Sequence, residues 1–311
     1  MSSDQANWAP PDLSGAVALV TGASRGVGRG VATALGDTGA TVYATGRSRP
    51  GSSTENLPGT IDDTAAEVSR RGGRGIAVHC DHFDDAQTVA LFERIERDHG
   101  RLDLVVNNAW AGYERGNDAK FDAPFWNQPL WRWDLFAGSL RAQYVASQRA
   151  VPLMLEANSG LIVNMSFTDG DVYLGQVAYD ISKTSSDRMV LGMAYDLRKT
   201  KITAVSLHPG LVRTERVAAA WEALGEGPAS VAHSAEYVGR AVACLLADPG
   251  RHERTGQRLA VGDLAERYGF SDTDGRRPGA FKLEGRMTLA TRMQRLNGLV
   301  GSLAVGNGSG T

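Results

Sequence analysis

The sequence of 311 residues has few cysteines, no marked excess of one charge and no long apolar run. Cys80 and Cys244 lie far apart in apolar surroundings, so we expect small core residues in a reducing compartment and predict no metal site. A formal net charge of -2 lacks the basic surplus typical of a nucleic-acid surface. The opening MSSDQANWAPPDLSG lacks the basic start and apolar run of a signal peptide. These absences predict a cytoplasmic location, no nucleic-acid partner and no stable membrane insertion.

Short apolar runs with little polar alternation are separated by longer segments that have helical periodicity. Strands of this kind are buried on both faces, so the pattern predicts a parallel sheet covered by helices, a doubly wound (Rossmann) α/β fold. The expected strands are residues 16–20, 40–46, 75–80, 102–108, 160–166, 202–208 and 257–263. Without an internal repeat, we expect one domain over residues 1–265 and a C-terminal extension over 266–311.

The first expected strand runs into TGASRGVGRG, residues 21–30. Glycines in this loop allow tight turning and let backbone N–H groups approach a phosphate at the start of a helix. The spacing differs from the G-x-G-x-x-G fingerprint, but its place between a strand and a helix favours a dinucleotide site. The expected cofactor contacts in the loop are Gly22, Ser24, Arg25, Gly26, Val27 and Gly28.

The choice of cofactor is predicted from the end of the second expected strand. An acidic residue there would hold a free ribose 2′-hydroxyl, but the sequence has Arg47 in TGRS. Arg47 and Arg25 together offer two guanidinium groups to a 2′-phosphate. The sequence therefore favours NADP(H) over NAD(H).

Several motifs occur in one order along the chain: TGASRGVG, NNA at 107–109, Ser166, YDISK at 179–183 and HPGLVRT at 208–214. This series resembles the short-chain dehydrogenase/reductase family over roughly residues 13–263. Ser166 precedes Tyr179 by 13 residues (179 − 166), which is the spacing of that family. More loosely, NNAWAGYERG, FWNQPLWRWD and GDLAERYGFSDTDGR resemble its member-one-like subgroup. The resemblance implies an NAD(P)-dependent oxidoreductase.

Tyr179 and Lys183 lie one turn apart on an expected helix, with both side chains on one face. A nearby ammonium would lower the pKa of the phenol, so we expect Tyr179 to act as the general acid and base. Ser166 would hold the substrate oxygen. By resemblance, Lys183 also binds the nicotinamide ribose.

The resemblance implies further cofactor contacts. Asn108 and Ala109 would line the bottom of the cofactor site, and Asp81 would contact the adenine ring. An acidic residue at the end of a strand can equally cap the following helix. His82 is grouped with the cofactor contacts, while it and His208 can also be structural or solvated. The segment after the sixth strand would contact the nicotinamide amide through Pro209, Gly210, Val212 and Thr214.

The sequence departs from the family at one catalytic position. Many members place an asparagine on the helix after NNA, where it supports a proton-relay water, but no asparagine occurs between Asn127 and Asn158. Aligning SLRAQY with the usual motif puts Ser139 there, and a hydroxyl can also position water.

Aromatic residues crowd the stretch from Trp110 to Trp133. Since it follows a strand that ends at the nicotinamide, we expect some of these rings, Trp110 among them, to line an apolar substrate pocket. Residues 216–234 are expected to form a lid, and residues 287–300 an amphipathic helix that packs on a partner subunit or on the lid. We expect a homo-oligomer, either a dimer or a tetramer.

The sequence leaves two function classes open. The first is an NADP(H)-dependent carbonyl reductase or alcohol dehydrogenase that acts on a hydrophobic small molecule. The second is a regulatory or scaffold protein that binds NADP(H) but has lost turnover with the relay asparagine. The intact Ser166, Tyr179 and Lys183 favour the enzyme. An epimerase or dehydratase is disfavoured, because such relatives carry other motif variants and longer chains.

Overall fold

The computed structural model describes residues 8–115, 118–167, 173–218 and 232–281. Its centre is a seven-stranded sheet with the order β3-β2-β1-β4-β5-β6-β7, in which every neighbouring pair is parallel. The strands are β1 (Val17–Thr21), β2 (Thr41–Gly46), β3 (Arg74–His79), β4 (Leu104–Asn107), β5 (Gly160–Met165), β6 (Ile202–His208) and β7 (Arg258–Ala260). The doubly wound fold predicted from the apolar runs is confirmed.

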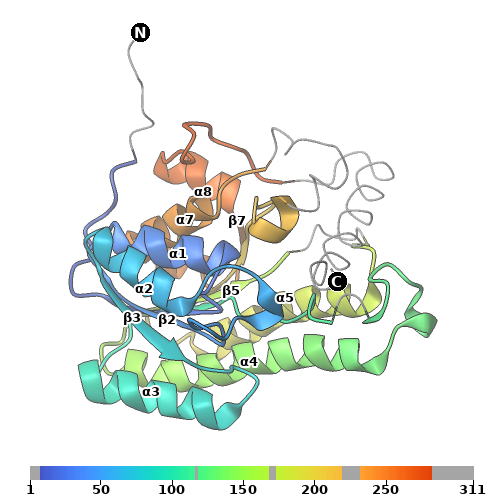
Figure 1. The fold of residues 1–311 in the computed structure, drawn as a ribbon. Helices are drawn as coiled ribbons and strands as arrows, with labels where there is room; N and C mark the ends of the chain where they lie inside the picture. Colours follow the sequence, from blue (N-terminus) through green and yellow to red (C-terminus); the bar gives the residue numbers. More distant parts are fainter. Residues whose placement is uncertain (1–7, 116–117, 168–172, 219–231, 282–311) are drawn as a thin grey trace.

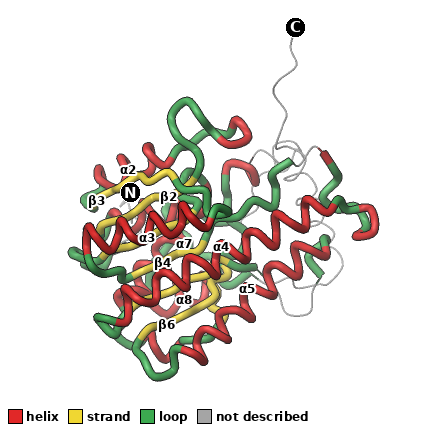
Figure 2. Tube along the Cα trace, turned by 90° about the horizontal axis from the view of Figure 1, so that it is seen from below, coloured by secondary structure: helices red, strands yellow, loops and turns green. Residues whose placement is uncertain are grey.

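Helices cover both faces of the sheet (Figure 1). One layer contains α1 (Gly26–Gly36), α2 (Ile61–Arg70), α7 (Ala235–Ala247) and α8 (Val261–Tyr268). The other contains α3 (Asp85–His99), α4 (Leu130–Leu155) and α5 (Val177–Asp196). Seen from below, α4 and α5 run side by side (Figure 2). Short 3-10 helices span Thr54–Asn56, Phe125–Asn127 and Arg251–Arg254.

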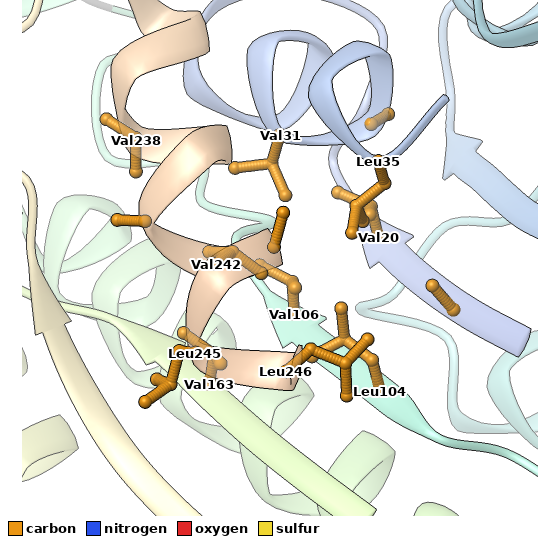
Figure 3. Close-up of a cluster of buried hydrophobic side chains, with 14 of the residues drawn as sticks. Val20, Val31, Leu35, Leu104, Val106, Val163, Val238, Val242, Leu245 and Leu246 are labelled. Atoms are coloured by element: carbon orange, nitrogen blue, oxygen red, sulfur yellow. The ribbon is translucent and has the colours of Figure 1, made fainter. Parts of the chain in front are cut away.

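The core explains why the strands lack polar alternation. Between the sheet and the layer of α1 and α7, aliphatic side chains from both helices meet those of the central strands (Figure 3). Val31 of α1, Val242 of α7 and Val106 of β4 each have no exposed surface. Burying such a side chain stabilises a fold by about 1.5–3 kcal/mol, so strands covered on both faces gain from being apolar throughout.

Local signals fix where the helices begin. Thr60 and Asp63 form a reciprocal capping box at the start of α2, and Asp84 caps α3 through the backbone N–H groups of its first turn. At α5, the side chain of Gln176 accepts a hydrogen bond from the backbone N–H of Tyr179 at 2.5 Å. This cap places Tyr179 in the first turn of α5.

The seventh strand is shorter than predicted. β7 ends at Ala260 and α8 begins at Val261, so the expected strand over 257–263 was wrong in its second half. The apolar run continues across the junction, and hydrophobicity alone could not locate it. The predicted domain limit at 265 falls inside α8, and Phe270, which is 1% exposed, belongs to the core.

Two expected features lie wholly or mostly outside the described residues: the amphipathic helix over 287–300 and most of the lid over 216–234. Within the part of the chain that the structure describes, no helix combines the length and apolar character needed to cross a membrane.

Candidate active site

A cavity of about 360 Å³ opens at the carboxyl ends of the strands, beside the point where the strand order reverses between β1 and β4. Doubly wound folds bind their ligands at this place. Most of the residues predicted from the sequence line the cavity: Gly22, Ser24, Arg25, Gly26, Val27, Arg47, Asp81, His82, Asn108, Ala109, Trp110, Ser166, Tyr179, Lys183, Pro209, Gly210, Val212 and Thr214. Of the predicted residues, Gly28 and Ser139 are not among those lining it.

The glycine loop is held against the turn that follows β4. Gly22 has a φ of +65°, and the Asn108 side-chain amide donates to the carbonyl oxygens of Thr21 at 2.9 Å and Gly22 at 3.0 Å. A Cβ on Gly28 would lie 2.3 Å from the oxygen of Gly22. Gly28 therefore lies beneath the loop and allows its close packing, rather than facing the cavity.

The first turn of α1 presents an anion site. The backbone N–H of Gly26 donates to the Glu215 carboxylate, at 3.1 Å from Oε2, and this contact puts a negative group of the chain at the positive end of the helix. Thr214 lies next in sequence and lines the same cavity. The donor set and the glycine cradle fit the pyrophosphate of a dinucleotide.

Arg25 lines the cavity, and its guanidinium is also bonded within the chain. Its guanidinium donates to the hydroxyl groups of Ser48, Ser53 and Thr54 and to the carbonyl oxygens of Leu57, Pro58 and Gly59. These bonds order the segment that follows β2. Most donors of Arg25 are engaged in these bonds, and its contact with a 2′-phosphate beside Arg47 stays a prediction.

Arg47 lies between two carboxylates. It forms a close ion pair with Glu114, and its Nη1 is 4.0 Å from Asp81 Oδ2. Asp81 Oδ1 accepts from the backbone N–H of Phe83 at 3.0 Å, whereas the cap of α3 is Asp84. The helix-cap interpretation of Asp81 was therefore wrong.

His82 faces the cavity but is also a structural residue. It is 4% exposed, and its Nε2 is 2.8 Å from the Thr45 hydroxyl, which itself donates to the oxygen of Val20. Since that hydroxyl proton is used, Nε2 must carry the imidazole proton. Burial lowers the pKa of His82 to about 4, so the ring is neutral at neutral pH.

Ser166 and the Tyr179–Lys183 pair meet at the cavity wall. Tyr179 is 7% exposed, and the Ser166 hydroxyl donates to the backbone oxygen of Lys183 at 3.0 Å. Burial raises the pKa of Tyr179 well above 10, with further contributions from Tyr113 and Asp180. The expected lowering by Lys183 was wrong for this structure, because the ammonium lies over the ring, 5.7 Å from its centre, and burial dominates.

Comparison with known proteins identifies this arrangement. A family model described as short chain dehydrogenase matches residues 16–225. The chain belongs to that family. It is an NAD(P)-dependent oxidoreductase with the family's Rossmann-type fold.

Individual relatives agree with this assignment. The chain is 39% identical over 276 residues to the mouse (Mus musculus) protein named dehydrogenase/reductase SDR family member 1, with 85% of each chain covered. A crystal structure of a putative dehydrogenase from Xanthomonas campestris is similar, with a TM-score of 0.73, 25% identity and coverage of 87% of this chain and 97% of that one. A metagenomic short-chain oxidoreductase in complex with NADP has a TM-score of 0.62, 26% identity and coverage of 80% and 96%.

In this short-chain dehydrogenase a buried serine stands at the position that many members of the family give to the relay asparagine. Ser139 is 2% exposed, donates to the carbonyl oxygen of Leu135 at 2.8 Å and accepts from the backbone N–H of Ala111 at 3.3 Å. Its hydroxyl is thus used within the protein. Gln143, one turn later on α4, does line the cavity, and the sequence analysis missed it.

A second feature missed from the sequence lies behind the Tyr179–Lys183 pair. Asp187, one turn after Lys183 on α5, accepts hydrogen bonds from the Ser206 hydroxyl and from His208 Nε2, the latter at 3.1 Å. Burial would raise the pKa of Asp187, but the bonds from His208 and Ser206 hold it below its usual value. The four-residue spacing from Lys183 was the available signal.

Aromatic and aliphatic side chains form the wall around Tyr179. Trp110 meets Tyr179 edge to face at a ring distance of 5.7 Å, and Tyr113 meets Trp110 in the same way at 4.7 Å. The rest of this cluster includes Phe121, Phe136, Phe167, Leu174, Leu211, Val217 and Phe281. Among the described residues, no group of three or more His, Cys, Asp or Glu side chains is placed to hold a metal ion.

Proposed function

We propose that this short-chain dehydrogenase interconverts a hydrophobic ketone or aldehyde with the corresponding alcohol, using NADP(H), with Tyr179 as the general acid and base. One observation carries the proposal: Ser166, Tyr179 and Lys183 line the same cavity as the glycine loop and the aromatic wall. A reactive oxygen held at Tyr179 would therefore lie between a dinucleotide cradle and an apolar surface.

The chain's own residues supply the proton and the placement. The glycine loop, Thr214 and the turn at Asn108 would hold the dinucleotide, whose nicotinamide supplies or accepts the hydride when bound. Ser166 would turn its hydroxyl from the Lys183 carbonyl oxygen to donate a hydrogen bond to the substrate oxygen. The Tyr179 phenol would give that oxygen its proton during reduction. In the reverse direction, tyrosinate would take the alcohol proton.

The pKa of Tyr179 decides which form of the phenol meets the substrate. Burial raises that pKa well above 10, so the phenol remains protonated at neutral pH and can donate its proton. Oxidation needs the phenolate, so the rate of alcohol oxidation should rise with pH.

The preference for NADP(H) rests on Arg47 at the end of β2, where it lines the cavity. The hydrophobic substrate class rests on the rings of Trp110, Tyr113 and Phe167 along the wall. Both parts can be tested by titrating NADPH and NADH and by assaying a graded series of aliphatic and aromatic carbonyls.

A cytoplasmic homo-oligomer, a dimer or a tetramer, is also part of the proposal. Large apolar side chains are exposed along α4 and α5, among them Tyr144, Leu191 and Tyr195. Monomeric proteins rarely leave extended apolar surfaces uncovered, and these helices lie side by side (Figure 2). Light scattering on the eluted peak of the full chain would measure the oligomer.

The rival function is NADP(H) binding without turnover. It gains some support from Ser139, whose hydroxyl is engaged inside the protein. The decisive experiment is a carbonyl and alcohol panel that follows NADPH absorbance, with NADPH binding measured beside it. Turnover of any compound that is lost in Tyr179→Phe supports the enzyme, whereas tight NADPH binding without any turnover supports the rival.

A further inference from the structure

Arg47, the residue proposed to bind the 2′-phosphate, already has internal counter-ions. The chain brings Arg47, Asp81 and Glu114 together from the ends of β2, β3 and β4, and all three line the cavity. Their side chains are 33%, 34% and 21% exposed. Water therefore screens these charges only in part, and the ion pairs are stronger than fully exposed ones.

Of the two carboxylates, Glu114 is the closer partner. It makes the direct ion pair, whereas Asp81 lies 4.0 Å from the guanidinium and is anchored by the backbone N–H of Phe83. Although burial opposes the charge on Arg47, the hydrogen bond that its guanidinium donates to Glu114 raises the guanidinium pKa above its ordinary value. Glu114 is thus the group that a competing anion must displace.

The two forms of the cofactor place opposite demands on this pair. A 2′-phosphate carries about −1.5 to −2 charges, so it must take Arg47 from Glu114 and is repelled by the carboxylate. A 2′-hydroxyl is neutral and can donate a hydrogen bond to a carboxylate, as it does in NAD-selective sites, without breaking the ion pair.

We propose that Glu114 is the internal counter-ion of Arg47, that it competes with the 2′-phosphate, and that it sets how strongly this enzyme selects NADP(H) over NAD(H). The inference rests on the proposed function in one respect: Arg47 must face the adenosine ribose. No short sequence motif places Glu114 there, because the contact depends on the turn after β4.

The same turn links the ion pair to the substrate side. Between Trp110 and Glu114 the chain closes a turn, with the backbone N–H of Glu114 donating to the oxygen of Ala111 at 2.9 Å. Trp110 and Tyr113, on this turn, contact the ring cluster around Tyr179. Displacing Glu114 by a phosphate therefore acts on the segment that carries part of the aromatic wall.

The test is calorimetric binding of NADPH, NADH, 2′,5′-ADP and 5′-AMP to the full chain and to Glu114→Gln. Glutamine keeps the size and an acceptor oxygen but removes the charge. We expect NADPH and 2′,5′-ADP to bind roughly tenfold more tightly to the variant. NADH and 5′-AMP, which lack the phosphate, should change by less than about twofold. Glu93→Gln, an exposed charge on α3, is the matched control and should leave the NADPH-to-NADH ratio unchanged.

A double-mutant cycle with Arg47→Gln separates competition from simple repulsion. If Glu114 acts through Arg47, the gain from Glu114→Gln largely disappears once Arg47 is replaced. An unchanged NADPH affinity in Glu114→Gln, an equal gain for NADH, or a full gain that persists without Arg47 each overturns the inference. Glu114→Asp keeps the charge and should retain the selectivity of the unaltered protein. It shows whether a change seen in Glu114→Gln comes from the lost charge or from altering the side chain at this position.

The outcomes for the two proposals differ. If the unaltered protein binds NADPH and NADH equally and Glu114→Gln gains a preference for NADPH, the inference stands while the proposed NADP(H) preference falls. If neither dinucleotide binds the unaltered protein, the proposed function fails and the inference falls with it.

Discussion

The ammonium of Lys183 lies 5.0 Å from the centre of the Trp110 ring. An aromatic face attracts a cation, but burial disfavours the charged form, and burial has the larger effect. Asp187, one turn further along α5, opposes that effect by its negative charge. The result is a pKa of about 8 for Lys183, close enough to physiological pH for the side chain to titrate there.

This value predicts proton uptake when the cofactor binds. Below pH 8 the amine of Lys183 is charged, and above it the amine is increasingly neutral. An anionic dinucleotide favours the charged form, so NADPH binding near pH 8 should take up a fraction of a proton per molecule, and affinity should weaken as the pH rises further. Calorimetry in buffers of different ionisation enthalpy measures the uptake directly.

Lys183→Arg is the control for this prediction. Guanidinium keeps the positive charge but does not deprotonate in this pH range, so the uptake assigned to Lys183 should vanish. If the unaltered protein and the arginine variant take up protons equally, another group is responsible.

The fold was predictable because its signals are local. Apolar runs such as the one that became β6 (Ile202–His208) were placed to the residue, and the glycine loop marked the start of α1. β7 was misjudged because it has only three residues and its apolar character continues into α8. Hydrophobicity reports burial in both elements and does not distinguish them.

Replacing Tyr179 by phenylalanine should separate chemistry from binding. The ring keeps its packing against Trp110 and Phe136, and only the titrating proton is lost. We expect turnover to fall by about 10²- to 10⁴-fold, while NADPH affinity stays within about threefold. Steady-state kinetics on any substrate from the panel, beside calorimetric NADPH binding, measures both effects. A fully active variant would exclude Tyr179 as the acid and base.

Replacing Ser139, unlike Tyr179, should affect stability more than turnover. Its hydroxyl is bonded to the carbonyl oxygen of Leu135 and to the backbone N–H of Ala111. Ser139→Ala should therefore cost about 1 kcal/mol of stability, and turnover should fall far less than the roughly 10²-fold typical of a lost proton-transfer group. Ser139→Asn, which restores the residue common in the family, adds volume at a site 2% exposed and should destabilise by about 1–3 kcal/mol. A large loss of kcat in Ser139→Ala, with unfolding unchanged, would reinstate the relay.

The parts of the site that sequence could not provide are side-chain directions and long-range pairs. Ser139 was placed on the correct helix, but its hydroxyl turned inward. Arg216 and Glu55, 161 residues apart, form an ion pair between the segment after β6 and the segment after β2, and both line the cavity. Neither residue belongs to a short motif. Such contacts depend on which loops lie side by side at the edge of the sheet. The spacing of residues along the sequence does not predict this.

The buried His82 should make the folded protein less stable in acid. The buried ring of His82 has a pKa of about 4, against 6.5 when unperturbed. Below pH 6.5 His82 is protonated in the unfolded chain, but in the folded protein it stays neutral until about pH 4. The free energy of unfolding therefore falls as the pH decreases through this window. The contribution of this one residue is about 3 kcal/mol between neutral pH and pH 4.

His82→Gln isolates this contribution. The glutamine amide can still donate to the Thr45 hydroxyl but does not titrate, so the variant should lose stability at neutral pH yet respond less steeply to acid. Urea unfolding at about pH 7 and about pH 5 for both proteins gives the two slopes. The difference in slope is the relevant quantity, because carboxylates elsewhere contribute equally to both proteins. Parallel pH dependences would mean that His82 is protonated in the folded state, and the neutral Nε2–H form assigned from its bond to Thr45 would then be wrong.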